Sequence, residues 1–430
     1  MNAILNRRDR CRLCNQIHLT LALPLAASPI ADAYVTPEML NEEQGIYPLD
    51  LYLCLDCGHI QNIDIVDPNV LFRDYTFVTS SSNGLLDHYK QYANEVVAKF
   101  DIPTDSLVIE IGSNDGSLLG FFKNKGLKVL GVDPARAIAE AANLRGIRTL
   151  PEFFTLEIAE RIREEFGLAE LITANNVFAH ADDLEGMVKG ISTLLSNRGI
   201  FIFEVSYLPD IIDRFLFDTV YHEHVSYHSL APLVQFFDRL GLQLFDVERI
   251  GSKGGSIRGF VRKSLNSNPE VTSQLTGLIR AEALRDFDKL ATYLNYSIAV
   301  EARKTALNSF LDKALSNGHT IAGYGASTTV TTLMWHFELT EKIGFLVDDN
   351  PNKNGLFAPR CHIPVFGSDE IYSRLPNCVV ILAWNFADQI IKRHLRFLND
   401  GGIFVLPLPD FKIISIANYS TAFDPKVQTV

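Results

Sequence analysis

The feature that most constrains the fold is a strand, a glycine-rich turn and a helix in direct succession, written SLVIEIGSNDGSLLGFFKNKG over residues 106–126. The apolar run predicts a strand, and the leucines and phenylalanines after the glycines predict an amphipathic helix. Further apolar runs follow at 127–134, 169–180 and 198–208. Strands that alternate with helices predict a doubly wound α/β sheet, whose ligands bind at the carboxyl ends of the strands.

A second unit of the same kind begins at HTIAGYGAS, residues 319–327, and continues into the helical TTVTTLMWHF. Later apolar runs include IPVFG, CVVILAWNF and GIFVLPLP. Gly323 and Gly325 match a phosphate-binding turn better than the first unit does, so a nicotinamide-binding domain is an open alternative. The segment between the two units, with its recurrent leucine and alanine, predicts a long helical connector.

Four of the six cysteines form two CxxC pairs, Cys11 with Cys14 and Cys54 with Cys57. Two such pairs are what a tetrahedral Zn²⁺ site with four thiolates needs, and four protein ligands would make the zinc structural. Two disulfides would suit a secreted protein, and a redox pair would explain only one of the motifs. The apolar segment 17–34 resembles a signal peptide, but it follows a cysteine pair and contains two prolines, so we expect a cytoplasmic protein.

Length and charge narrow the class of protein further. A chain of 430 residues predicts several domains, and we place them at 1–70 (zinc), 71–270 (methyl donor), 271–300 (helical connector) and 301–430 (second α/β unit). The formal net charge of −12 disfavours nucleic acid as a partner. No stretch is apolar for long enough to predict a membrane span.

The glycine-rich turn of the first unit predicts S-adenosylmethionine rather than a dinucleotide. Glu110 and Asp115 flank the turn, where carboxylates would repel a pyrophosphate but suit a cationic ligand. Asp133 ends the next strand and is placed to accept hydrogen bonds from a ribose diol. This pattern is typical of class I (Rossmann-like) methyltransferases. The predicted cofactor-binding residues are Glu110, Gly112, Ser113, Asn114, Asp115, Gly116, Asp133, Asn175 and Asn176.

The order of these motifs resembles the sugar C-methyltransferase family over nearly the whole chain. The resemblance is carried by the four cysteines, by the central unit with YHEH at 221–224, and by GYGAS…DDNP…IPV…AWN in the last unit. It implies an N-terminal zinc-binding domain, a central methyltransferase domain and a C-terminal Rossmann-like domain that binds a nucleotide sugar. The implied reaction adds a methyl branch, at carbon 3, to a nucleotide-diphosphate 4-keto-deoxysugar. One departure is that GYGA is followed by STTVTT rather than by the family's lysine and asparagine.

The resemblance also implies roles for particular residues. The catalytic groups that carry over are Tyr75, His180, Tyr221, Glu223 and His224. The implied substrate-binding residues are Lys253 and Arg258 in GSKGGSIRGF, with Tyr324, Gly325, Ala326, Ser327, Asp348 and Asn385 in the last unit.

The chemistry explains why histidines would gather in YHEH. A carbon beside a ketone becomes nucleophilic only after it loses a proton, and an imidazole is a suitable general base near neutral pH. The resulting enolate oxygen needs hydrogen-bond donors. We assign His224 as the base, Glu223 as its support, and Tyr221 and His180 as donors; an exchange of roles between the two histidines is open.

Three other functions remain open at this stage. They are O- or N-methylation of the same sugar class, a non-catalytic zinc-ribbon binding protein, and a nicotinamide oxidoreductase that uses GYGAS. The sequence leaves the nucleotide, the stereochemistry and the oligomeric state open, a monomer included.

Overall fold

The computed structural model describes residues 4–75, 77–264 and 270–422, without the side chains of Asn83, Lys253 and Ala422. By contacts the chain divides into two compact units. Unit 1 holds residues 1–20, 52–210 and 223–290, and unit 2 holds residues 21–51, 211–222 and 291–430. Each unit is described by itself.

Unit 1 contains a seven-stranded sheet in the order β12-β13-β10-β9-β6-β7-β8. Its strands are β6 (Leu107–Ile111), β7 (Lys128–Val132), β8 (Thr149–Leu150), β9 (Ala169–Asn175), β10 (Leu195–Ser206), β12 (Leu242–Ile250) and β13 (Ser256–Lys263). The pairs β6–β7, β7–β8, β6–β9 and β9–β10 are parallel, whereas β13 runs antiparallel to both of its neighbours. This order is that of a class I methyltransferase and confirms the predicted fold class.

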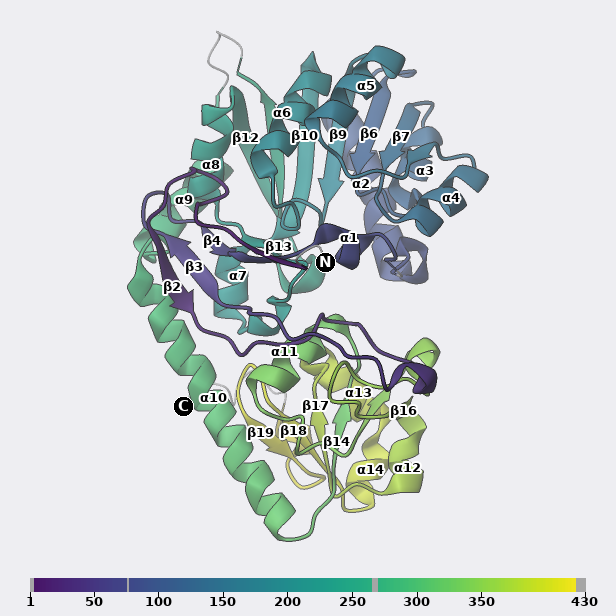
Figure 1. Ribbon diagram of the computed structural model, residues 1–430, viewed down its shortest axis with the longest axis vertical. Coiled ribbons are helices and arrows are strands. Elements are labelled where there is room, and N and C mark those ends of the chain that lie inside the picture. The colour runs from purple at the N-terminus through teal and green to yellow at the C-terminus, as the bar shows by residue number, and fades with distance from the viewer. Residues whose placement is uncertain (1–3, 76, 265–269, 423–430) are drawn as a thin grey trace. The chain divides into compact units, whose positions relative to one another are not determined.

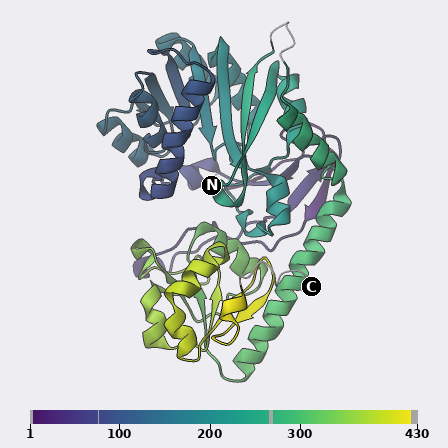
Figure 2. The same ribbon diagram turned by 180° about the vertical axis from the view of Figure 1, so that it is seen from behind.

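Helices cover both faces of this sheet (Figures 1 and 2). Alternate strand residues point to opposite faces, so Ile109 packs in one cluster and Val108 in the other. The first cluster lies under α5 (Leu156–Phe166), α6 (Leu184–Leu194) and α8 (Leu230–Arg239). The second lies under α2 (Asn83–Lys99), α3 (Ser117–Lys123) and α4 (Arg136–Leu144).

The N-terminal part of unit 1 carries the cysteines on short strands and turns. β3 (Leu51–Cys54) leads into the second CxxC turn, and β4 (Ile60–Asn62) follows it. β4 pairs antiparallel with β11 (Ser226–Tyr227), while β1 (Leu5–Arg7) pairs with β5 (Asp64–Val66). Helix α1 (Pro68–Phe72) follows β5 and precedes α2, after which β6 begins the seven-stranded sheet.

Unit 2 contains a six-stranded sheet in the order β16-β15-β14-β17-β18-β19. Its strands are β14 (Ile321–Tyr324), β15 (Phe345–Asp348), β16 (Val365–Gly367), β17 (Cys378–Ile381), β18 (Ile403–Leu406) and β19 (Lys412–Ile414). Only β19 is antiparallel to its partner among these paired strands. Its helices include α11 (Thr328–His336), α12 (Ile371–Arg374), α13 (Ala387–Arg393) and α14 (Leu395–Asn399). The predicted second α/β unit is confirmed.

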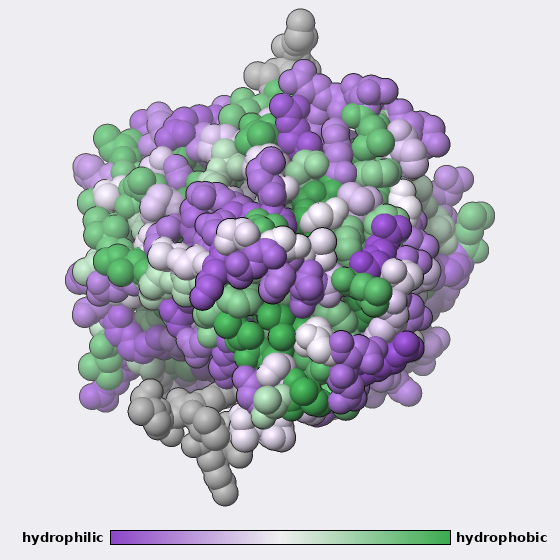
Figure 3. Space-filling view, turned by 90° about the horizontal axis from the view of Figure 1, so that it is seen from below, coloured by the Kyte–Doolittle hydropathy of each residue, from purple (hydrophilic) through white to green (hydrophobic). Residues whose placement is uncertain are grey.

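The predicted connector is two helices rather than one. They are α9 (Ser273–Leu284) and α10 (Leu290–Ser316), and the break contains Asp286 with a φ of 54°. A residue in this left-handed region cannot continue an α-helix. None of the described helices is both long and apolar enough to cross a membrane. On the face seen from below, hydrophilic and hydrophobic side chains are interspersed (Figure 3).

Candidate functional site

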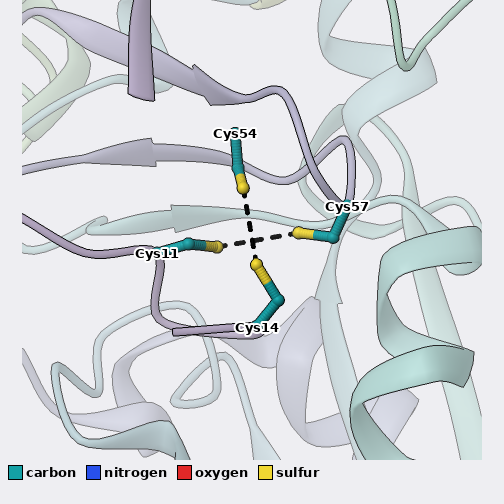
Figure 4. A group of neighbouring side chains, drawn as sticks. All are labelled: Cys11, Cys14, Cys54 and Cys57. Atoms are coloured by element: carbon teal, nitrogen blue, oxygen red, sulfur yellow. Dashed lines mark hydrogen bonds between the residues drawn. The ribbon is translucent and has the colours of Figure 1, made fainter. Parts of the chain in front are cut away.

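The four cysteines of the CxxC pairs point toward one another (Figure 4). Their sulfur atoms all lie within 4.8 Å of one another, with Sγ–Sγ distances of 3.6 Å for Cys11–Cys57 and 3.5 Å for Cys14–Cys54. Backbone hydrogen bonds shape both turns, from Asn15 N to Cys11 O and from Gly58 N to Cys54 O, each 2.9 Å long. These turns aim both sulfurs of each pair inward.

This cluster fits Zn²⁺. A tetrahedral ion with Zn–S bonds of about 2.3 Å holds its sulfurs about 3.8 Å apart, close to the distances observed. A disulfide would need sulfurs about 2.0 Å apart, and all six cysteines are free. Contacts with Cys11 and Cys54, together with burial, raise the pKa of Cys57, so a cation is needed to stabilise four thiolates together. With four protein ligands, the ion has a structural role.

The turn after β6 adopts a backbone conformation that favours glycine. Gly112, Asn114 and Gly116 have φ values of 66°, 49° and 74°, in the left-handed region. A Cβ on Gly112 would lie 2.2 Å from Cγ2 of Val177, so any side chain there would collide with the loop after β9. Both the φ angle and the close approach therefore explain this glycine.

Asp133, at the end of β7, is held toward this turn. Its Oδ2 accepts a hydrogen bond of 2.7 Å from Asn114 N, and its Oδ1 accepts one of 2.9 Å from Ala135 N. Burial nevertheless raises the pKa of Asp133. A carboxylate oxygen has two lone pairs, so the group retains capacity to accept bonds from ribose hydroxyls.

Buried polar atoms at the end of β6 lack partners among the described residues. They are Oε2 of Glu110 and Oγ of Ser113. Burial raises the pKa of Glu110 well above its ordinary value, and the carboxylates of Asp133 and Asp115 add to this rise. Such a site fits a ligand that brings cationic and hydroxyl groups, as S-adenosylmethionine does. The residues present therefore fit the predicted cofactor.

The segment 77–81 is fastened to the turn through two predicted cofactor residues. Asn114 Oδ1 accepts a bond of 2.8 Å from Thr79 N, and Asn114 Nδ2 donates to Phe77 O at 2.9 Å. Asp115 Oδ2 accepts from Ser80 N at 3.1 Å. The side chains of Asn114 and Asp115 thus hold segment 77–81 against the turn. The sequence did not predict this role, because the contacting residues are 35 or more positions apart in the chain.

The structure brings the two predicted catalytic histidines together. The ring centroids of His180, after β9, and His224 lie 5.0 Å apart, and both rings are half-buried. The two loops are joined by hydrogen bonds from Val225 N and Ser226 N to Ala179 O, of 2.9 and 3.1 Å. Glu223 is buried beside His224 in the chain.

Aromatic rings extend this pair on one side. Phe72, the last residue of α1, stacks on His180 with centroids 5.6 Å apart and planes 10° apart, and it lies 6.2 Å from the ring of Tyr75. Tyr75 is therefore close to the histidines through Phe72. Phe72 could not be identified from the sequence, because nothing local distinguishes it from a core phenylalanine.

The other aromatic residues of the stretch YHEHVSYHS, residues 221–229, lie in both units of the chain. Tyr221 is the next-to-last residue of segment 211–222 and belongs to unit 2. His222, which ends the segment, has its Nε2 3.2 Å from Tyr47 O. Burial lowers the pKa of His222 to about 4, so this ring is neutral near pH 7. In unit 1 the buried His228 stacks on His59.

The predicted substrate residues lie in varied settings. Arg258 in β13 is buried, and its Nε lies 2.7 Å from Glu204 Oε1, while its Nη1 lies 3.2 Å from Glu95. These contacts favour a structural role for its guanidinium. The side chain of Lys253 lies outside the described residues.

In unit 2, the predicted residues surround the turn after β14. Gly325 has a φ of 121°, and Asp348 Oδ2 accepts a bond of 2.6 Å from Ala326 N. The hydroxyl of Tyr324 donates to Asp349 Oδ1 at 2.9 Å and lies 3.0 Å from His394 Nε2. Ser327 precedes α11, and Asn385 lies in a 3₁₀ turn after β17.

Comparison with known proteins gives three family matches along the chain. They are "Putative zinc binding domain" over residues 11–72, "Methyltransferase domain" over 86–247 and "C-methyltransferase C-terminal domain" over 251–409. The chain is 32% identical to the C-methyltransferase NovU of Streptomyces niveus over 416 residues, which cover 96% of this chain and 99% of that protein.

Solved structures match part of the chain at lower similarity. Magnesium protoporphyrin IX methyltransferase from Synechocystis is 14% identical, with a TM-score of 0.33, and the match covers 42% of this chain and 84% of that one. An S-adenosylmethionine-dependent methyltransferase from Clostridium acetobutylicum is also 14% identical, with a TM-score of 0.33 and coverages of 42% and 92%.

Proposed function

The chain belongs to the C-methyltransferase family, and we propose that it methylates carbon 3 of a nucleotide-diphosphate 4-keto-deoxysugar. It is an S-adenosylmethionine-dependent enzyme with a zinc-binding module, so the non-catalytic and the O- or N-methylating alternatives fall away. The finer statement, the sugar nucleotide and the carbon, is our proposal, and it places the enzyme in deoxysugar biosynthesis in the cytoplasm.

The observation that carries the proposal is the approach of His180 and His224 to 5.0 Å in unit 1. Two imidazoles at this spacing provide what enolisation needs, one group to take a proton from carbon and another to donate to the oxygen. Methyl transfer to an ordinary hydroxyl would not need this second group. A ketone next to the methylated carbon is therefore the substrate feature that the pair fits best.

We assign the steps to this chain's residues as follows. His224 takes the proton from carbon 3 at an imidazole nitrogen, and Glu223 stabilises the imidazolium that results. His180 and Tyr75 donate to the oxygen on which negative charge develops. S-adenosylmethionine, when bound, supplies a methyl group on a cationic sulfur.

Further residues are proposed for the rest of the ligands. Tyr221 is the remaining donor to sugar oxygens. The turn of Tyr324, Gly325, Ala326 and Ser327, together with Asp348 and Asn385, is proposed to bind the nucleotide. Lys253 and Arg258 remain substrate-binding residues that the resemblance implies. Arg258 is the weaker candidate, because its guanidinium already pairs with Glu95 and Glu204.

The test is turnover of a panel of thymidine, guanosine and cytidine diphosphate 4-keto-6-deoxysugars. Replacing a general base should lower kcat by about 10²–10⁴-fold, so we expect such a loss in His224→Gln and a loss also in His180→Gln. The matched control is His319→Gln, because His319 is exposed in unit 2. Affinity for S-adenosylmethionine should be unchanged in all three variants.

Two results would overturn the proposal. One is full turnover in both the His224 and the His180 variants. The other is a product whose NMR spectrum shows the new methyl carbon bonded to an atom other than carbon 3.

A further inference from the structure

The arginine inside the first cysteine turn is the most deeply buried cation of the zinc module. Arg12 lies between Cys11 and Leu13, and its side chain has 0% exposure, compared with 25% for Arg8. A buried guanidinium is costly unless each N–H finds an acceptor. Its partners therefore show what it is placed to hold.

One set of partners lies on the loop that carries His180. Arg12 Nε donates to Asp182 Oδ1 at 3.1 Å, and Nη2 lies 3.0 Å from the same oxygen as an ion pair without hydrogen-bond geometry. Asp182 is two residues beyond His180. The side chain of Asp182 is 28% exposed, so solvent weakens the stabilisation that this ion pair provides.

The other partners lie on β4 and on the loop that carries His224. Arg12 Nη1 donates to Val225 O at 3.0 Å, to Asn62 O at 2.5 Å and to Gln61 Oε1 at 3.1 Å. Val225 directly follows His224, and its carbonyl also accepts a bond of 3.0 Å from Asn62 N. A single side chain therefore contacts the neighbours of both histidines.

We propose that Arg12 is a positioning residue that sets the spacing between the imidazoles of His180 and His224. This inference rests on the proposed function, because it assumes that those two rings do the chemistry. The guanidinium is planar, and its N–H groups have fixed directions, so it holds two loops at a defined separation in a way that the single ammonium of lysine does not. The four-cysteine turn fixes the backbone of Arg12, which gives the zinc module a part in catalysis without contact to the substrate.

The experiment compares Arg12→Lys with Arg8→Lys. Arg8 also pairs with Asp182, through Nη1 at 3.1 Å, but it has no described contact with Val225, so it is a matched control for the loss of a guanidinium contact with Asp182. A displacement of about 1 Å in a reacting group costs on the order of 10²-fold in rate. We therefore expect Arg12→Lys to lower kcat by about 10²-fold, with KM, S-adenosylmethionine affinity and zinc content near their original values, and Arg8→Lys to change none of them.

A second readout does not depend on activity. In protein labelled with ¹³C at the histidine Cε1, the resonances of His180 and His224, assigned with the glutamine variants, should shift in Arg12→Lys and stay in place in Arg8→Lys. A resonance from the exposed His319 should not move in either. A purely structural role would instead lower zinc content or thermal stability and affect all resonances together.

A second variant keeps the proposal testable should Arg12→Lys fail to fold. Asp182→Ala removes the contact of Arg12 with the His180 loop and leaves its contact with Val225, and we expect kcat to fall about tenfold. It also removes the pair with Arg8, for which Arg8→Lys is the control. Where Arg12→Lys does fold, the losses in the double variant should be less than additive, because both changes break one contact.

The outcomes separate this inference from the proposed function. If His224→Gln and His180→Gln abolish turnover but Arg12→Lys and Asp182→Ala keep the original kcat and spectra, the positioning role is wrong and the function stands. An equal loss in Arg8→Lys and Arg12→Lys also overturns it, since the contact with Asp182 that both arginines make would then be responsible, without the bridge to Val225. If the histidine variants turn over normally, the proposed function itself has failed.

Discussion

The two α/β sheets of this chain share the same arrangement of a glycine-rich turn and an aspartate. They differ in whether the buried polar atoms around that turn have hydrogen-bond partners. In each, a glycine-rich turn follows one strand, and an aspartate ends the next strand along the chain. Asp133 accepts a bond of 2.7 Å from Asn114 N in unit 1, and Asp348 accepts one of 2.6 Å from Ala326 N in unit 2. The aspartate in each case organises the turn.

The difference lies in the buried polar groups around the turn. In unit 1, Glu110 and Ser113 keep buried oxygen atoms without partners among the described residues. In unit 2, the buried hydroxyl of Tyr324 already has Asp349 and His394 as partners. The unsatisfied oxygens therefore favour the turn of unit 1 as the place for a polar ligand, whereas the glycine pattern favoured unit 2 for a nucleotide.

The largest effect should come from replacing the turn glycines in each sheet. In Gly112→Ala, the positive φ and the collision with Val177 should weaken S-adenosylmethionine binding on the order of 10²-fold. Gly325→Ala introduces the same kind of backbone strain in unit 2, so the affinity for S-adenosylmethionine should stay unchanged. Calorimetry with S-adenosylmethionine measures both, and equal losses in the two variants would remove the distinction between the sheets.

A smaller effect is expected from the two aspartates. Asp133→Asn keeps one acceptor oxygen but loses the charge that strengthens bonds to ribose hydroxyls, so affinity for S-adenosylmethionine should fall about tenfold. Asp348→Asn should leave that affinity intact. If Asp348→Asn lowers affinity as Asp133→Asn does, the donor site has been assigned to the wrong sheet.

The smallest effect concerns the pH dependence of stability. As pH changes, the contributions of Glu110 in unit 1 and Asp349 in unit 2 to the free energy of unfolding should change with opposite signs. Burial raises the pKa of Glu110, so its contribution to stability is present below pH 4.5 and is lost as pH rises through the folded pKa. Burial also acts to raise the pKa of Asp349, but bonds from Ser368 and Tyr324 and the charge of Arg393 lower it overall. Its contribution is present above pH 3.8 and is lost as pH falls through the folded pKa.

Urea unfolding at pH 3, pH 5 and pH 8 checks this contrast, because the contribution of Asp349 changes only near and below pH 3.8. Glu110→Gln should gain stability at pH 8 relative to pH 5, whereas Asp349→Asn should lose stability at pH 5 and pH 8 and less of it at pH 3. Both tryptophans, Trp335 and Trp384, belong to unit 2, so fluorescence follows that unit and circular dichroism follows both. Parallel pH responses in the two variants would contradict the assigned environments.

Local pattern predicted the sheets and the metal cluster. Apolar runs of strand length, glycine turns and paired cysteines are set by neighbours in the sequence, and the structure has β6, β14 and the four-sulfur cluster where these patterns place them. The strand order in each sheet, and the position of its antiparallel strand, could not be predicted from local pattern, because they depend on contacts along the whole chain.

Contacts between residues far apart in the chain could not be predicted from the sequence. Residues 21–51 lie between the cysteine pairs yet belong to unit 2, where Val35 bridges to Phe357. Arg12 appeared to be a spacer in a CxxC motif, and its partners Asp182 and Val225 are 170 and 213 residues away. Such roles depend on which loops the fold brings together, and no local pattern encodes them.

The most direct test of the account follows hydrogen exchange at carbon 3 in D₂O, with S-adenosylhomocysteine bound so that no methyl group can be transferred. Proton NMR of the ketosugar should show enzyme-dependent loss of the signal beside the ketone with the original protein and none with His224→Gln/His180→Gln. Exchange as fast in the double variant as in the original protein, or methylation without any exchange-competent base, would contradict a mechanism in which this imidazole pair makes the carbon nucleophilic.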